Sequence, residues 1–321
     1  MRELCIIGAG EAGINLIKEL RSLDKDLRIS FVDKRDYYFT RKDLFLWWAA
    51  KSPCQIIKLE DFAKDWDVQF IKAKVERINF NNRKIFLKDK EAIEFKELVI
   101  SSGAKSKDLF IKGDFREGFF YLSGVEPFLI KDLLKISSDT IVFASTILGI
   151  RLAIYLSFLN LEIKLIAQNL SFLGNYQTRI LEFLKEKNID IYLDATIEEV
   201  FGESMVKATK VSLPKVLSSQ LVFVDSGFIP NRKFFDAQIT VQDNFFTNYE
   251  RVYFLGEVNN EAIENERFFI FNTQDARAQA HCLAKYLIKK ESMPYNRCVA
   301  TQAEIAGFLD NFIKSEVALT S

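Results

Sequence analysis

A glycine-rich turn near the start of the chain limits the fold more than any other feature. Residues 3–7 form an apolar run that predicts a short buried strand, and residues 8–13 read Gly-Ala-Gly-Glu-Ala-Gly. The apolar residues that follow recur at the spacing of one helix face, so the pattern is strand, glycine turn, helix. In a Rossmann unit Gly8 permits the tight turn, Gly10 lets a pyrophosphate approach the backbone, and Gly13 lets the helix pack closely on the strand. The segment therefore predicts the start of a dinucleotide-binding unit.

An acidic residue stands where such a unit contacts a ribose. A second apolar strand is predicted at residues 27–32, and it ends at Asp33, 20 residues after Gly13. A carboxylate at this place accepts hydrogen bonds from ribose hydroxyls. A glycine turn alone also serves purely structural connections. Here strand, helix, spacing and acidic residue agree, so we predict a nucleotide site.

The same order of elements returns at residues 140–166, with different chemistry. A strand, a turn, a helix and another strand are predicted there in succession. Ala144 and Thr146 replace the first two glycines of the turn, and only the third, Gly149, is kept. Ala167 stands where the ribose-binding carboxylate is expected. The repeat is a good signal for the fold and a poor one for a second nucleotide site.

These patterns predict an α/β fold with two Rossmann-like dinucleotide-binding domains, the second inserted in the first. We assign residues 1–110 and 246–295 to the first domain and residues 111–245 to the second. Residues 296–321 form a C-terminal segment, where a capping box at residues 301–304 precedes a short amphipathic helix. Its mostly acidic polar face favours packing on its own domain or on another subunit, as in a homo-oligomer or complex, over a membrane surface.

Composition excludes several classes of function. The 44 Lys and Arg residues balance 44 Asp and Glu residues, so nothing indicates a nucleic-acid partner. One histidine and four cysteines without Cys-x-x-Cys spacing argue against metal clusters, histidine-based triads and a local dithiol, and Cys5 is expected to be a small core residue. The longest apolar run, residues 44–50, is too short for a transmembrane segment, and no signal peptide is recognised. We therefore expect a cytoplasmic protein whose chemistry comes mainly from a cofactor.

Taken in order, these segments resemble the pyridine nucleotide-disulfide oxidoreductase superfamily, especially its rubredoxin reductase, ferredoxin reductase and NADH dehydrogenase-like flavoproteins. The resemblance rests on residues 8–13, Asp33, residues 98–104, 144–149, 225–231 and 252–257. It implies that FAD is bound without a covalent link. The residues that it assigns to the cofactor are Gly8, Gly10, Gly13, Asp33, Lys34, Gly103, Gly256 and Glu257. Among them Gly256 and Glu257 resemble the family's late Gly-Asp motif at the ribityl and phosphate part of the flavin.

The segment that begins at Asp36 looks like the one that runs along the flavin in these enzymes. Arg41 or Lys42 there would supply positive charge to a reduced flavin, or would form a solvated charged turn, and the sequence leaves both open. Where disulfide reductases carry their cysteine pair, residues 44–48 read Leu-Phe-Leu-Trp-Trp, so we expect no redox-active disulfide. The two tryptophans either fill the core or shield the flavin.

The second nucleotide site departs from the family pattern at several positions. Arg151 stands where the family carries a glutamate near the nicotinamide, and the degenerate site comprises Ala144, Thr146, Gly149 and Arg151. NAD(P)H is therefore a doubtful donor. Three explanations remain: a nucleotide bound in an altered pose through Arg151 or Gln168, electron supply from a protein partner, or a domain retained as scaffold.

The sequence thus predicts an FAD-dependent oxidoreductase that passes electrons through the flavin to a small redox protein or a small-molecule acceptor. The alternative is an FAD-containing electron-transfer or structural subunit of a larger complex that does not use NAD(P)H.

Overall fold

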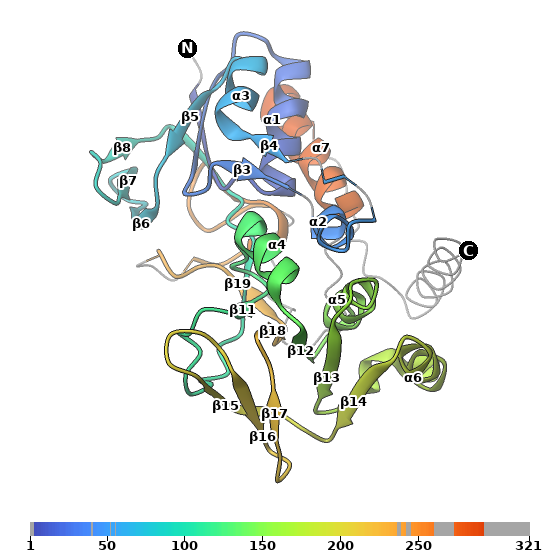
Figure 1. The fold of residues 1–321 in the computed structure, drawn as a ribbon. Coiled ribbons are helices and arrows are strands. Elements are labelled where there is room, and N and C mark those ends of the chain that lie inside the picture. Colours follow the sequence, from blue (N-terminus) through green and yellow to red (C-terminus); the bar gives the residue numbers. More distant parts are fainter. Residues whose placement is uncertain are drawn as a thin grey trace.

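The computed structural model describes residues 3–39, 41–51, 53–54, 56–235, 239–241, 245–259 and 273–291, and the side chains of residues 41–43 and 273–274 are not included. The amphipathic helix expected at the C-terminus lies outside these residues. Two five-stranded sheets organise the chain, one above the other in Figure 1, and each is covered by helices. The two-unit α/β fold expected from the sequence is confirmed.

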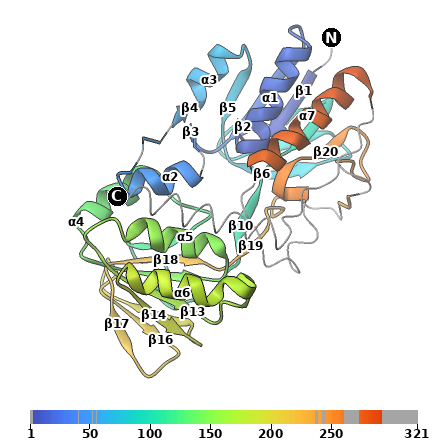
Figure 2. The same cartoon turned by 90° about the vertical axis from the view of Figure 1, so that its right-hand side faces the viewer.

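The first sheet has the strand order β20-β9-β1-β2-β5, and all its neighbouring pairs are parallel. Its strands are β1 (Glu3–Ile7), β2 (Arg28–Asp33), β5 (Gln69–Lys72), β9 (Glu97–Ile100) and β20 (Val252–Phe254). The helices of this unit are α1 (Glu11–Leu23), α3 (Leu59–Asp65) and α7 (Thr273–Lys289). Helix α1 buries Ile14, Ile17 and Leu20, as its periodicity predicts, and α7 lies beside it (Figures 1 and 2).

The second sheet has the strand order β11-β18-β12-β13-β14, again with parallel pairs, and its last four strands correspond to β9-β1-β2-β5 of the first sheet. Its strands are β11 (Phe119–Tyr121), β12 (Asp139–Ala144), β13 (Glu162–Ala167), β14 (Ile189–Leu193) and β18 (Leu221–Asp225). Its helices are α4 (Pro127–Ile136), α5 (Ile147–Leu156), the 3-10 helix η1 (Ser171–Tyr176) and α6 (Gln177–Glu186). Strand β20 of the first sheet follows the second unit in the chain, so the second unit is inserted in the first.

Smaller sheets complete the repeat. A three-stranded antiparallel sheet precedes β9 in the first unit and β18 in the second. The first comprises β6 (Val75–Asn79), β7 (Lys84–Leu87) and β8 (Ile93–Glu94), and the second β15 (Ile197–Phe201), β16 (Ala208–Val211) and β17 (Val216–Ser218). The two connections between the units pair with each other as the antiparallel strands β10 (Ala104–Ser106) and β19 (Phe228–Pro230). The remaining elements are β3 (Tyr37–Tyr38), α2 (Arg41–Trp48), β4 (Ile57–Lys58) and the 3-10 helix η2 (Gly256–Asn259).

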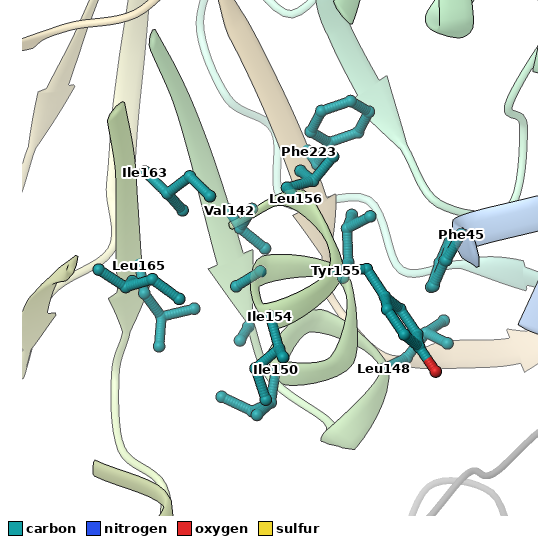
Figure 3. Packing of buried hydrophobic residues seen from close by; sticks show 14 of the residues in the cluster. Phe45, Val142, Leu148, Ile150, Ile154, Tyr155, Leu156, Ile163, Leu165 and Phe223 are labelled. Atoms are coloured by element: carbon teal, nitrogen blue, oxygen red, sulfur yellow. The ribbon is translucent and has the colours of Figure 1, made fainter. Parts of the chain in front are cut away.

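Helix α2 joins the two units through its apolar face. It follows β2 in the chain, yet it lies between the two sheets beside α5 (Figures 1 and 2). Phe45 lies next to Leu148 and Tyr155 of α5, as Figure 3 shows, and belongs to the same buried cluster. Trp48 is 2% exposed, and its indole nitrogen donates a hydrogen bond to the Pro127 carbonyl at 3.0 Å. Of the two roles considered for the tryptophans, Trp48 fills the core.

The first strand buries a thiol that we expect to be unreactive. Cys5 is 3% exposed, and burial raises the pKa of its thiol to about 12, although a hydrogen bond with Ser30 acts in the opposite direction. Thiolate is the reactive form, so iodoacetamide should leave Cys5 unmodified in the folded protein and modify it after denaturation. Peptide mass spectrometry checks this, with the half-buried Cys282 as the internal comparison. Modification of Cys5 as fast as Cys282 would contradict the buried position.

Within the described residues, no helix is both long and apolar enough to cross a membrane. Likewise, no cluster of three or more potential metal ligands occurs among them.

Candidate functional site

The glycines of the first turn have different physical roles. Gly8 has a φ of +100°, and a Cβ there would lie 2.4 Å from the Ser101 carbonyl oxygen. A Cβ on Gly13 would lie 2.1 Å from the Gly8 carbonyl oxygen. Both positions therefore require glycine so that β1, β9 and α1 can approach one another.

Gly10 is different, because a Cβ there would meet no described atom within 4 Å. It is the N-cap residue of α1, a 13-residue helix, and as a glycine it has no side chain that could accept a hydrogen bond from the first helical turn. The N–H groups of a first helical turn have no partner inside the helix, and the helix dipole favours an anion at that end. The start of α1 is thus an uncapped helix end that faces open space, and a phosphate fits this setting.

Asp33 lies beside this helix end at the terminus of β2. Its side chain is 7% exposed, and it accepts a hydrogen bond from Ala9 N at 2.7 Å. Arg35, which the sequence analysis missed, donates three further hydrogen bonds: its backbone N and Nε to Oδ1, and Nη2 to Oδ2 at 2.9 Å. Burial alone would raise the pKa of Asp33, but the Arg35 charge and these hydrogen bonds hold it below the ordinary value. Lys34 is exposed next to it.

The lowered pKa of Asp33 predicts a pH dependence of stability. The ionised carboxylate stabilises the fold fully above its unfolded pKa of about 3.9, and this contribution is lost as the pH falls through the lower folded pKa. Asp33→Asn should lower the stability of FAD-free protein at neutral pH by about 2 kcal/mol, and the deficit should shrink below about pH 4. Thermal unfolding across this range measures it. Asp36→Asn, which removes an exposed ion pair with Lys72, is the control and should change little. A deficit for Asp33→Asn that stays constant down to acid pH would contradict this account.

The late motif lies against the same helix end. Gly256 has a φ of +76°, and a Cβ there would lie 2.9 Å from the Ala12 side chain on α1. Its N–H donates to Gln279 Oε1 at 2.7 Å, so α7 also holds this turn. Glu257 accepts a hydrogen bond from Ala104 N at 3.2 Å through Oε2. That oxygen would be 3.5 Å from a Cβ on Gly103.

The structure therefore brings most of the assigned cofactor residues to one edge of the first sheet, at the carboxyl ends of β1, β2 and β9. Open α/β sheets bind ligands at this edge. Arg41 and Lys42 form part of the first turn of α2, but their side chains lie outside the description. Their effect on a flavin remains a prediction. The sequence offered little that could have identified Arg35 or Gln279. Arg35 could be noticed only because it follows Asp33 by two residues, and Gln279 only because it lies on a late helix.

The turn between β12 and α5 corresponds to the first glycine turn, but it carries different side chains. A Cβ on Gly149 would lie 2.7 Å from the Ala144 side chain, so Gly149 is needed for packing as Gly13 is. Thr146 is the N-cap residue of α5, and its hydroxyl accepts a hydrogen bond from Leu148 N at 3.2 Å. Ala167 is fully buried at the end of β13.

A buried carboxylate that the sequence analysis did not single out completes this cap. Asp225, at the end of β18, is 0% exposed. Its Oδ2 accepts hydrogen bonds from Thr146 N at 2.9 Å, Thr146 Oγ1 at 2.7 Å and Gly149 N at 2.9 Å. Burial raises the pKa of Asp225, and these hydrogen bonds act in the opposite direction.

The two side chains considered for binding a nucleotide in this unit differ in burial. Arg151 is 7% exposed, and its guanidinium carbon lies 5.9 Å from the centre of the Tyr155 ring. Gln168 is exposed at the end of β13. Their contact with a phosphate or ribose stays a prediction.

Comparison with known proteins places most of the chain in one family. The family model for pyridine nucleotide-disulphide oxidoreductases matches residues 2–282. Apoptosis-inducing factor 3 of Mus musculus and of Homo sapiens is 22% identical over 307 residues, which cover 89% of this chain and 51% of each relative. The chain thus spans about half the length of the curated relatives that it matches.

Solved structures agree on the fold. Putidaredoxin reductase in its covalent complex with putidaredoxin superposes with a TM-score of 0.78 at 18% identity, covering 92% of this chain and 76% of that one. A ferredoxin reductase from Rhodopseudomonas palustris gives a TM-score of 0.78 at 19% identity, covering 92% and 78%. At these identities the likeness concerns the fold alone. Because the family model spans both sheets and both glycine turns, this chain belongs to the pyridine nucleotide-disulphide oxidoreductase family.

Proposed function

We propose that this protein binds FAD in its first unit and passes electrons through the flavin to a small redox protein or a small-molecule acceptor. The observation that carries the proposal is the contrast between Gly10, where the end of α1 is uncapped and open, and Thr146, where the end of α5 is capped. The family membership and the fold of the reductases named above support the same conclusion.

The residues of the first unit fit the ADP half of FAD. A pyrophosphate would accept hydrogen bonds from the N–H groups at the start of α1. Asp33 would accept hydrogen bonds from ribose hydroxyls in place of those that it now accepts from the Arg35 side chain. Gly256 and Glu257, held by α7 and β10, would serve the ribityl and phosphate part. When bound, FAD supplies the capacity to accept and release electrons, and the protein binds and orients it.

We further propose that electron transfer does not pass through a protein disulfide. Cys5 and Cys282 are free thiols in the structure. Helix α2, where disulfide reductases carry their cysteine pair, instead presents Leu44, Phe45 and Trp48 to the core. We propose a small redox protein as the acceptor, since the putidaredoxin reductase structure is a complex with putidaredoxin, and we propose a cytoplasmic location.

A visible spectrum followed by anaerobic reduction tests the proposal. The purified protein should be yellow, and dithionite should bleach its flavin absorbance. Colourless protein that cannot take up FAD on reconstitution would overturn the proposal. If the FAD-loaded protein copurifies with a stable partner and transfers no electrons to any soluble acceptor, the alternative of a structural FAD subunit would replace the enzymatic one.

A further inference from the structure

The two units begin their first helices in the same way, but different residues face the two helix ends. Ile7 pairs with Ile100 across β1 and β9, and Phe143 pairs with Val224 across β12 and β18. The next residues, Ser101 and Asp225, are therefore equivalent. A Cβ on Gly13 would lie 2.8 Å from Ser101 Oγ, and one on Gly149 would lie 3.0 Å from Asp225 Oδ2.

The hydroxyl of Ser101 leaves the end of α1 available. Its single O–H points to two carbonyl acceptors, Ile7 O at 3.0 Å and Gly8 O at 2.8 Å. Neither bond uses an N–H group of the helix. A ligand anion can therefore accept hydrogen bonds from the first N–H groups of α1.

The carboxylate of Asp225 does the opposite in the second unit. It accepts from the backbone N–H groups of Thr146 and Gly149 and from the Thr146 hydroxyl, all through Oδ2. Its other oxygen lies 3.4 Å from Gly227 N. Helix α5 is a ten-residue helix whose dipole favours an anion at this end. Three donors onto Oδ2 likewise favour the ionised form of the buried Asp225 side chain, against the effect of burial on its pKa, so the protein itself provides that anion.

We propose that Asp225 is an internal substitute for the nucleotide pyrophosphate and thereby closes the second unit to NADH and NADPH. An incoming pyrophosphate would find the N–H groups of Thr146 and Gly149 already bonded and would bring like charge against a buried carboxylate. This inference rests on the proposed function and adds to it that one residue, Asp225, determines whether the second unit binds a nicotinamide nucleotide. Electrons then enter the flavin from a donor other than a nicotinamide nucleotide held at α5.

The first test removes the carboxylate and restores the features of the first unit. Thr146→Gly clears the space but keeps Asp225, whereas Thr146→Gly with Asp225→Ser also supplies the residue found at position 101. Calorimetric titration of FAD-saturated protein with inorganic pyrophosphate should show binding to the double variant about tenfold or more tighter than to Thr146→Gly, since one hydrogen bond to a charged group is worth at least that factor. Equal affinity of the two folded variants would overturn the proposal. So would saturable binding of NADH or NADPH to the unmodified protein below about 1 mM, the upper end of common KM values.

The reciprocal test moves the carboxylate into the first unit and remains available if the double variant fails to fold. Ser101→Asp should place an anion at the start of α1 and expel FAD, whereas Ser101→Asn, of the same size without the charge, should retain more FAD. Absorbance of the bound flavin and far-UV circular dichroism report binding and folding separately. Equal FAD content in the two variants would overturn the proposal.

The outcomes separate this inference from the proposed function. Protein that never binds FAD contradicts the proposed function alone. The two second-unit variants share the same first unit, so the difference in their pyrophosphate affinity, measured then on FAD-free protein, still reports on Asp225, and the Ser101 variants are compared only where the unmodified protein binds FAD. Conversely, yellow protein that binds NADH at α5 contradicts the inference and leaves the FAD assignment intact.

Discussion

Gly10→Val is expected to give a folded protein that no longer retains FAD. A side chain at this position meets no described atom within 4 Å, so the polypeptide itself accommodates valine. The same space is where a pyrophosphate must approach the uncapped start of α1, and two methyl groups there would block it. Flavin absorbance per chain should therefore fall to the background level while the circular dichroism spectrum stays unchanged.

Two other glycines make the result specific. Gly124→Val, between β11 and α4, also enters open space and should leave FAD content unchanged. Gly13→Val should disrupt the first unit itself, because its Cβ would lie 2.1 Å from the Gly8 carbonyl oxygen. Retention of stoichiometric FAD by Gly10→Val would show that the cofactor does not lie at this helix end.

The first unit could be predicted from the sequence because the residues that define it lie close together in the chain. The roles of Gly8 and Gly13 follow from a spacing of a few residues, and the structure shows the close backbone contacts that these roles require. The repeat of the unit was predicted for the same reason, since strands and an amphipathic helix recur in order. The replacement of two glycines by Ala144 and Thr146 was equally visible.

What the sequence could not predict depends on contacts between distant segments. Asp225 lies 79 positions after Thr146, and only the pairing of β12 with β18 brings its carboxylate to the start of α5. Gln279 likewise contacts Gly256 through the packing of α7 on η2. Apolar residues in α2 were recognised as apolar, but nothing in their spacing indicated that they would pack against the other unit.

Trp48→Ala is expected to destabilise the protein by about 3–5 kcal/mol, the usual cost of deleting a large buried aromatic side chain. Trp48 is 2% exposed, its ring lies 5.6 Å from that of Phe45 and 6.1 Å from that of Phe223, and it bonds to the Pro127 carbonyl. Phe223 and Pro127 belong to the second unit, whereas Trp48 enters from the first. Loss of the Trp48 side chain should therefore weaken the contact between the units. In chemical denaturation, the unfolding transitions of the two units should lie further apart in denaturant concentration for the variant than for the unmodified protein.

Two further variants distinguish packing from hydrogen bonding. Trp48→Phe keeps an aromatic ring and removes the indole N–H, so it should cost less than Trp48→Ala while leaving the Pro127 carbonyl without this donor. Phe110→Ala deletes an aromatic side chain that is 87% exposed and should change stability by less than about 0.5 kcal/mol. If Trp48→Ala were as mild as Phe110→Ala, α2 would not join the two units.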